Sequence, residues 1–268
     1  MNRLTATVAI LALVIPSALA PGGPDGFALQ TKSLADAIHG NTLIFIEKPS
    51  KEKFPLAEGL DAAGWFQVDL SKSANRTTVD NNRGGWISEG PKQDLRRLSA
   101  GMHTYYGVPF SVLDCQNGAK PNCIATASQH ISVSQAPERV SVEVGRPARV
   151  LYFLAACAWS TMKQNYEVTA HYADGTADKF QINPAGVLRG QYENIHEWAN
   201  SDEVIETPVS RPVVLPLDNT AAGIANSRTI YVLEWPIPKP DKTIIRLEVA
   251  GDKDYQATVI IMAITGHK

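Results

Sequence analysis

This sequence has few cysteines, few aromatic residues and no marked excess of either charge. Of 268 residues, three are cysteines and 7% are aromatic, while 25 Lys and Arg stand against 27 Asp and Glu. No basic block of the kind that neutralises phosphates interrupts this balance, so nucleic acid is not expected as a partner. Three scattered cysteines without a Cys-x-x-Cys pair make a weak case for zinc.

The signatures of several enzyme classes are missing as well. The chain has no Gly-x-Ser-x-Gly elbow, no His-Glu-x-x-His and no phosphate-binding glycine loop. These absences disfavour serine hydrolases, zinc proteases and nucleotide-dependent enzymes. Beyond the first twenty residues, no segment approaches the roughly 20 uninterrupted apolar residues that a membrane span needs.

What is present indicates a globular, all-β protein. Hydrophobic residues make up 44% of the chain, and 17 Pro and 19 Gly interrupt it often, which favours short strands over long helices. Alternating or continuous apolar patterns predict ten strands, over 65–70, 106–113, 123–133, 139–144, 149–158, 165–172, 178–182, 228–235, 242–249 and 255–265. With no helix–strand alternation, residues 64–268 are expected to form one β-sandwich domain.

The N-terminus resembles an export signal. Arg3 precedes an apolar stretch over 4–15, and Ala18-Leu-Ala20 has the small-x-small pattern of a cleavage site. Pro21 fits poorly after such a cut, so cleavage after Ala28 is an alternative, and an uncleaved anchor or buried helix is another. We expect a signal peptide over 1–20, a linker and N-terminal extension over 21–63, and a secreted or periplasmic location. Within the extension, residues 33–38 have helical and 41–47 strand character.

A series of short motifs runs through the predicted sandwich. In chain order they are Phe66-Gln-Val-Asp-Leu, Asn75-Arg76, Gly84-Gly85-Trp86, Gly90-Pro91, Asp94-Leu95-Arg96, Gly107-Val-Pro-Phe, Tyr152-Phe-Leu, His171-Tyr-Ala-Asp-Gly, Asn194-Ile195-His-Glu-Trp198, Val232-Leu-Glu-Trp235 and Ala263-Ile264-Thr265-Gly266. The ordered set resembles the galactose-binding-like jelly-roll domains appended to bacterial secreted carbohydrate-active enzymes. The resemblance implies a jelly roll and contact with carbohydrate. This chain departs from the common arrangement because it carries no catalytic domain beside the sandwich, and it inserts a longer segment over 186–202.

Two loops hold the candidate sugar-binding residues. Trp86 on its glycine-supported loop could stack on a sugar ring with Arg83 and Asp94 beside it, or it could plug the core. The second loop combines aromatic, amide and cationic side chains, which suit a polyhydroxylated ligand; its alternative is a capped loop with Ile195 and Trp198 buried. The expected ligand-binding residues are Arg83, Trp86, Arg189, Tyr192, Asn194, His196 and Trp198.

An enzymatic alternative depends on different residues. If 101–106 is extended, His103 and Tyr105 share one face and could move a proton in polysaccharide lyase chemistry, with Arg189 and His196 assisting. The alternative is a strand edge with a satisfied histidine and a packed tyrosine. A glycosidase pair could come from Glu89, Asp94, Glu193, Glu197 or Glu234, but sequence gives no separations. Glu234 lies in mid-strand, where an exposed face is the ordinary expectation.

Cysteines and oxygen ligands give two further expectations. Cys115 and Cys123 flank a turn-rich loop and are predicted to form a local disulfide in an oxidising compartment, while Cys157 lies in an apolar run. Structural calcium is the one cofactor considered, with Asp69, Asn75 and 80–82 offering oxygens in no defined loop spacing.

Taken together, the sequence predicts a secreted jelly roll that binds a polysaccharide or glycan. The alternatives are a small polysaccharide lyase or glycoside hydrolase on the same sandwich, and a non-catalytic structural protein of the cell envelope.

Overall fold

Antiparallel β-sheet accounts for nearly all regular structure in the computed structural model, which describes residues 59–81, 85–86, 94–160, 166–184, 194–196, 207, 209–216 and 227–268. These residues fall within one compact unit, Pro49–Lys268. A single 3-10 turn, Ala62–Gly64, precedes the first strand. No helix among them is long and apolar enough to cross a membrane. The expected signal peptide, helix and strand before residue 59 lie outside the described residues.

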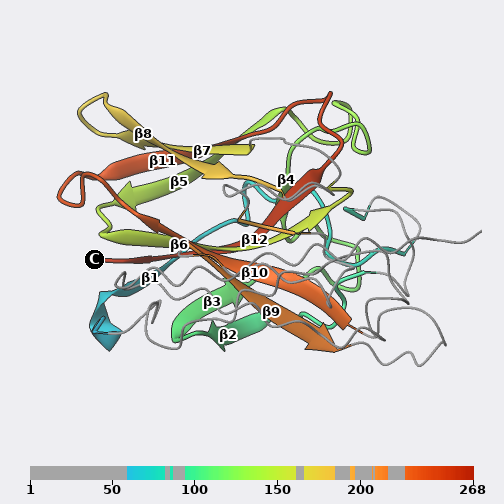
Figure 1. Cartoon of the computed structure of the whole chain (residues 1–268), viewed down its shortest axis with the longest axis horizontal. Helices are drawn as coiled ribbons and strands as arrows, with labels where there is room; N and C mark the ends of the chain where they lie inside the picture. The colour runs from blue at the N-terminus through green and yellow to red at the C-terminus, as the bar shows by residue number, and fades with distance from the viewer. Residues whose placement is uncertain are drawn as a thin grey trace, which may run out of the picture. The chain divides into compact units, whose positions relative to one another are not determined.

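The largest sheet has six strands. Five follow the order β1 (Trp65–Val68), β12 (Thr258–His267), β6 (Val150–Ala158), β10 (Ser227–Pro236) and β9 (Ser210–Pro216), and β4 (Ile124–Ala125) pairs with β12. A four-stranded sheet has the order β5 (Arg139–Arg146), β11 (Ile244–Ala250), β7 (Tyr166–Tyr172) and β8 (Ala177–Ile182). A hairpin of β2 (Gly101–Tyr105) and β3 (Val108–Val112) completes the set. Figure 1 shows the four-stranded sheet above the six-stranded sheet and the hairpin below it.

The six-stranded sheet is covered on both faces. All nine residues of β6 are buried, which confirms the expectation drawn from its continuous apolar run. Leu151 and Phe153 enter a first core, shared with the four-stranded sheet. Tyr152 and Leu154 enter a second core on the opposite face, closed by β3 and by loop residues such as Ile131. The result is a sandwich-like arrangement with an added layer on one side.

Most of the predicted strands are confirmed. The Asp-Gly turn between β7 and β8 forms as expected: Gly175 has φ +83°, the Tyr172 amide donates to the Thr176 carbonyl at 2.9 Å, and Asp174 accepts from the Thr176 amide.

Charged pairs line the outer side of the four-stranded sheet, including Lys179–Glu167 at 3.0 Å. An outer face with paired charges is the usual solvated side of an antiparallel sheet.

One strand prediction is largely wrong, and two strands, β2 and β9, were not among the ten predicted. The alternation over 123–133 yields only the two residues of β4, because the segment beyond it is a packed loop whose Ile131 enters the second core. Strand β9 was not predicted because Pro212 and Pro216 weaken its strand pattern. Its place at the edge of the sheet explains the prolines, since an edge strand leaves amide positions outside the ladder.

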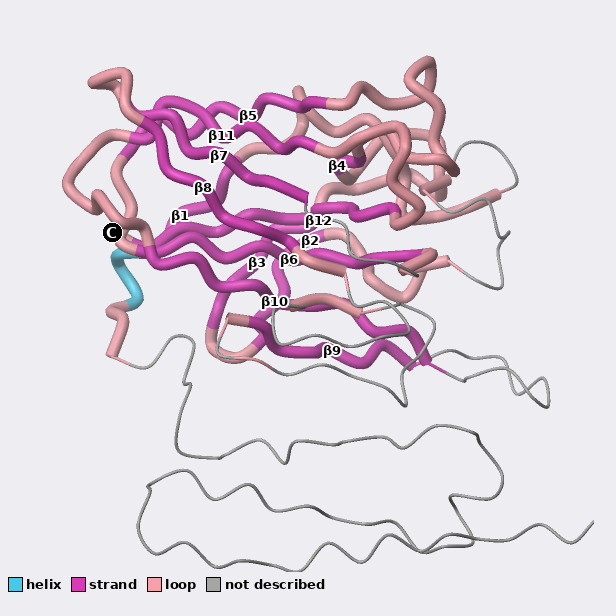
Figure 2. The backbone as a smooth tube through the Cα atoms, turned by 45° about the horizontal axis from the view of Figure 1, so that its top comes forward, coloured by secondary structure: helices cyan, strands magenta, loops and turns pink. Residues whose placement is uncertain are grey.

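The long connections gather where β6 ends and β12 begins. We call this the loop end of the sandwich; it includes residues 69–81, 126–138 and 251–257 (Figure 2). The Ser128 and Thr258 hydroxyls hydrogen-bond there at 2.7 Å, and the Gln129 amide donates to the Tyr255 carbonyl at 2.8 Å. Loops on a rigid sandwich are common positions for binding sites.

Candidate functional site

Three of the seven predicted ligand-binding residues, Trp86, Asn194 and His196, belong to the described part of the chain. Arg83, Arg189, Tyr192 and Trp198 lie outside the described residues. Among the others, Trp86 belongs to the second core, whereas Asn194 adjoins Ile195 of the first core. The six-stranded sheet separates these two cores, so Trp86 and Ile195 pack on opposite faces of it.

Trp86 is part of the core. Its side chain has 0% exposure, and its amide donates to the Thr77 carbonyl at 3.1 Å. A ring without exposed surface cannot stack on a sugar in this conformation. The stacking role is therefore corrected to the alternative, a core plug beneath its loop.

The side chain of Asn194 holds its segment against β8 through hydrogen bonds. Asn194 donates from Nδ2 to the Gln181 carbonyl at 2.8 Å and accepts from the Asn183 amide at 2.9 Å. Ile195 is fully buried, and Asn194 and His196 are each only 5% exposed. An amide that satisfies two backbone groups beside β8 is structural, so these side chains offer little surface to a ligand.

His103 and Tyr105 do form a pair. They lie on one face of β2, with parallel rings (7°) whose centroids are 5.8 Å apart. The Tyr105 hydroxyl is 3.5 Å from His103 Nδ1, and His103 Nε2 donates to the Ser99 carbonyl at 2.7 Å. Because a carbonyl only accepts, Nε2 carries the proton and Nδ1 is the basic nitrogen facing the tyrosine. Burial raises the pKa of Tyr105, so this hydroxyl is suited to donate a proton rather than to act as a tyrosinate base.

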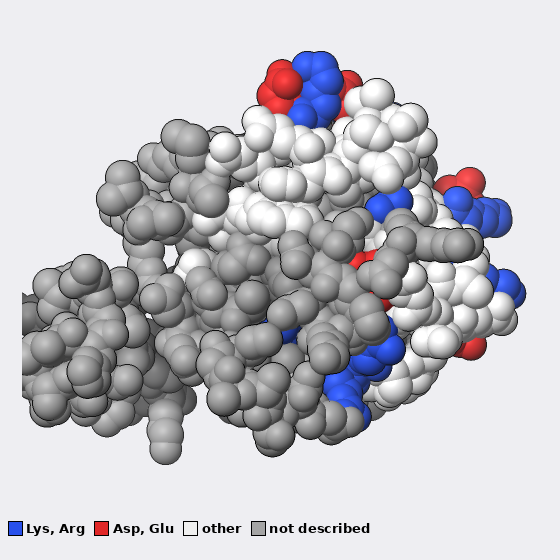
Figure 3. Space-filling model, turned by 90° about the vertical axis from the view of Figure 1, so that its right-hand side faces the viewer, with Lys and Arg blue, Asp and Glu red and all other residues white. Residues whose placement is uncertain are grey.

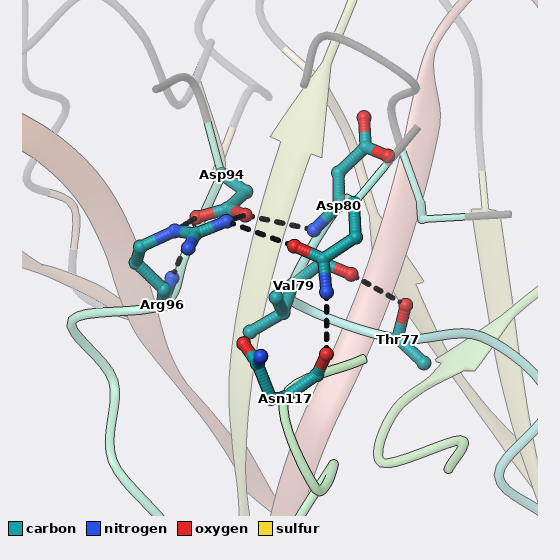
Figure 4. A network of polar contacts seen from close by, with 7 residues as sticks. Thr77, Val79, Asp80, Asp94, Arg96 and Asn117 are labelled. Carbon is teal, nitrogen blue, oxygen red and sulfur yellow. Dashed lines mark hydrogen bonds and ion pairs between the residues drawn. The ribbon is translucent and has the colours of Figure 1, made fainter. Parts of the chain in front are cut away.

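Hydrogen bonds among Asp80, Asp94 and Arg96, which we call the polar clasp, hold the loop that leads to Trp86. Asp94, 1% exposed, accepts from Arg96 Nε at 2.9 Å and Nη2 at 2.7 Å. It also accepts from the Asp80 amide at 2.7 Å, and Asn81 donates to the Asn117 carbonyl. Figure 4 shows these groups facing one another across three loop segments. A two-pronged carboxylate–arginine pair is among the stronger hydrogen-bonded arrangements in proteins, so the clasp holds these loops on the second core.

Two of the residues proposed for calcium, Asp69 and Asn75, use their oxygens in hydrogen bonds within the protein, and Asn82 lies outside the described residues. Asn75 donates to the Ala125 carbonyl and accepts from the Ala125 amide, both at 2.9 Å. Asp69 accepts from the amide and hydroxyl of Ser71. Within the described part of the chain, no three His, Cys, Asp or Glu residues gather closely enough to hold a metal ion.

An aromatic pair at the loop end was not predicted. Trp159 follows β6, and its ring stacks on that of His130 with centroids 4.0 Å apart and planes 16° apart. The indole is half-buried against the second core, while His130 is exposed. Trp159 has φ +56°, a left-handed conformation that is a rare outlier for a bulky residue and recurs at functional sites. In the sequence Trp159 looked like the continuation of a buried strand, and nothing linked it to His130.

The predicted disulfide is absent. Cys115 and Cys123 are both free thiols. Cys123 is fully buried, and its Sγ donates to the Arg76 carbonyl at 3.3 Å. Gln116, Asn117 and Gly118 all take left-handed φ values. The intervening loop thus closes by its own backbone turn, without a bond between the cysteines, and cysteine usage gives no support for an oxidising compartment.

Thiol labelling checks this arrangement. Burial raises the pKa of Cys123, and only the thiolate reacts with alkylating agents. We expect the half-buried Cys115 to label before Cys123 in the folded protein. After unfolding without reductant, intact mass should show three labels; a single label would restore the disulfide.

Comparison with known proteins leaves the fold without a family. No protein-family model matches this chain, and no curated protein matches its sequence. The geometry of the described residues is therefore what supports any function.

Proposed function

We propose that this protein is an exported jelly-roll module that binds a polysaccharide or glycan through the His130–Trp159 pair. The chain passes repeatedly between the two main sheets, from β5 to β6 to β7 and from β10 to β11 to β12, which supports the jelly-roll topology. The signal-like N-terminus supports secretion or transfer to the periplasm.

The stacked pair carries the proposal. Its rings are stacked face to face at the loop end, with His130 exposed and Trp159 half-buried, and the apolar face of a sugar packs well on exposed aromatic surface. The indole nitrogen of Trp159 adds a hydrogen-bond donor of the kind that orients hydroxyls. The left-handed Trp159 backbone turns the ring out of the strand's regular path, so the strained conformation has a positional effect.

The surrounding surface favours a neutral glycan. Figure 3 views the loop end, where the described surface is largely uncharged and the Lys, Arg, Asp and Glu side chains stand in separate groups. Several of these charges are paired with each other, as Lys253 is with Asp254 at 2.8 Å. A polyanionic ligand would need a continuous basic surface.

Substitution of the pair tests the proposal. On a glycan array and in affinity gels containing neutral polysaccharide, we expect Trp159→Ala to weaken binding by about 1–3 kcal/mol, roughly 5- to 150-fold, through loss of aromatic contact. His130→Ala should also weaken binding. His171→Ala is the control because His171 lies on β7 in the four-stranded sheet and belongs to neither candidate site. Binding that survives Trp159→Ala would reject this site.

A second candidate function is a lyase centred on the hairpin. The observation that favours it is the defined tautomer of His103, whose basic Nδ1 faces the Tyr105 hydroxyl. In this candidate His103 removes a proton and Tyr105 supplies one to the leaving oxygen. Formation of an unsaturated product from uronate polysaccharides, abolished by both His103→Ala and Tyr105→Phe, would support it. No turnover of such polymers would eliminate it.

A further inference from the structure

The two edges of the β2–β3 hairpin differ in their hydrogen bonding. On the β3 edge, the Pro109 carbonyl accepts from Gln67 Nε2 at 2.8 Å, and the Ser111 amide donates to Gln67 Oε1 at 3.1 Å. Because these groups point away from β2, Pro109 and Ser111 occupy non-hydrogen-bonded positions of the β2–β3 ladder. Their partners across the ladder are Thr104 and Met102. The backbone amides and carbonyls of those two residues therefore point outward, away from β3.

The outward backbone groups of β2 are open to solvent. Met102 is 62% exposed, and Thr104 is exposed as well. Their amides and carbonyls form no hydrogen bond with any residue that the structure describes. A row of unpaired donors and acceptors along an edge strand is a template for pairing with another strand.

Other edge strands are protected in ways that β2 is not. Two prolines remove amide donors from β9. The Ser141 carbonyl on β5 and the Gln181 carbonyl on β8 accept from the side chains of Ser73 and Asn194. Strands β5 and β8 also carry charged residues, whereas residues 98–113, which include the whole hairpin, contain no Lys, Arg, Asp or Glu. Prolines, capped backbone groups and charges are the usual obstacles to strand addition, and β2 has none of them among the described contacts.

We propose that β2 pairs antiparallel with β2 of a second copy of this chain in a two-fold symmetric dimer. Met102 and Thr104 lie on either side of His103, so a two-fold axis beside His103 places each Met102 opposite Thr104 of the partner subunit. Each of these two pairs exchanges two backbone hydrogen bonds. The two hairpins then form one continuous antiparallel sheet. This inference is independent of the glycan site at the loop end.

The chemistry of this edge favours a second copy as the partner. A two-fold axis brings identical strands together, so any charge on the strand would lie close to its like, and like charges across a strand pair are destabilising. A strand without charged residues avoids this repulsion. The side chain of Met102, one of the exposed large hydrophobic residues in the described part of the chain, would also lose exposed surface against Thr104 of the partner subunit.

Sedimentation of the full chain at increasing concentration tests the dimer. A five-residue edge is short for an interface, and stable interfaces bury at least about 1,200 Å². We therefore expect reversible dimerisation at concentrations on the order of 100 μM. Constant monomer mass up to about ten times that concentration would overturn the proposal.

Two substitutions on β2 should weaken the dimer. Thr104→Pro removes the outward amide and leaves the bonds between β2 and β3, because that amide does not face β3. It should raise the dissociation constant at least about tenfold, since each copy loses a donor. Met102→Lys should act in the same direction by bringing two charges near the axis. Ile245→Lys is the matched control, because Ile245 is 46% exposed on β11 in the four-stranded sheet; it should dimerise like the wild type.

Disulfide cross-linking tests the register. In this pairing His103 faces His103 of the partner subunit with Cα atoms about 4.5 Å apart, which a disulfide can span. His103→Cys should therefore give a covalent dimer on mild oxidation. Met102→Cys should not, because the two Met102 positions are diagonal neighbours about 7–8 Å apart. The wild-type protein, with its three free cysteines, is the reference.

Other outcomes would also reject the second copy as the partner. A dimer unaffected by Met102→Lys lies elsewhere on the molecule, and this exposed substitution decides the matter even if Thr104→Pro fails to fold. A chain that stays monomeric but binds a synthetic peptide with the sequence of residues 100–106 would assign the edge to a strand of a different protein.

Discussion

Replacing Trp86 with alanine should lower the free energy of unfolding by about 3–5 kcal/mol. The indole has no exposed surface and packs in the second core near Leu95 and Phe110, so truncation leaves a large cavity under the loop. Denaturant titration gives the free-energy difference directly. The melting temperature should fall by about 2–4 °C for each kcal/mol.

Two companion variants make the Trp86 result specific. Tyr106→Ala removes an aromatic side chain that is 48% exposed and should cost well under half as much. Trp86→Phe keeps most of the apolar volume and should preserve any glycan binding. If Trp86→Phe abolished binding while leaving the melting temperature unchanged, Trp86 would be a ligand contact after all.

Asp94→Ala is expected to destabilise the fold by about 1–3 kcal/mol, chiefly because buried hydrogen-bond donors lose their acceptor, while the partly exposed Arg96 can turn to water. The carboxylate has 0% side-chain exposure, whereas that of Arg96 is 36%. Loss of the carboxylate also deprives the Asp80 amide of its acceptor. Thermal and chemical denaturation measure the effect.

An exposed ion pair supplies the control for the clasp. Lys253 and Asp254 lie 2.8 Å apart with side-chain exposures of 57% and 78%, so Asp254→Ala should change stability by less than about 1 kcal/mol. Asp94→Asn keeps an acceptor for the backbone amides and removes the charge, and should fall between the two. Equal, small effects of Asp94→Ala and Asp254→Ala would show that the clasp contributes little.

The two tryptophans show what the sequence could and could not predict. Trp86 follows two glycines in a loop, a context that suggests exposure, yet it is buried because the hairpin and the loop carrying Ile131 close over that face of the sheet. Trp159 ends an apolar run, a context that suggests burial, yet its left-handed backbone directs it toward His130. Both outcomes depend on contacts between distant segments, which no local pattern records.

Strand β6 was predictable from the sequence, whereas the environment of Glu234 was not. The continuous apolar run over 149–158 was enough to predict a strand buried on both faces, because that property belongs to the segment itself. The environment of Glu234 was not predictable, because the alternating pattern of its strand shows only which residues share a face of the sheet. Its half-burial depends on the strands beside it, because β10 lies between β6 and β9 in the sheet.

The position of β12 within the six-stranded sheet has a kinetic consequence. Strand β12 pairs with β1, β4 and β6, so the middle of this sheet cannot close until residues 258–267 have been synthesised. Pairing Trp65 with His267 joins segments far apart in the chain, and proteins dominated by such distant pairings fold slowly, on the order of milliseconds to seconds. The six-stranded sheet can therefore be completed only after nearly the whole chain has been synthesised.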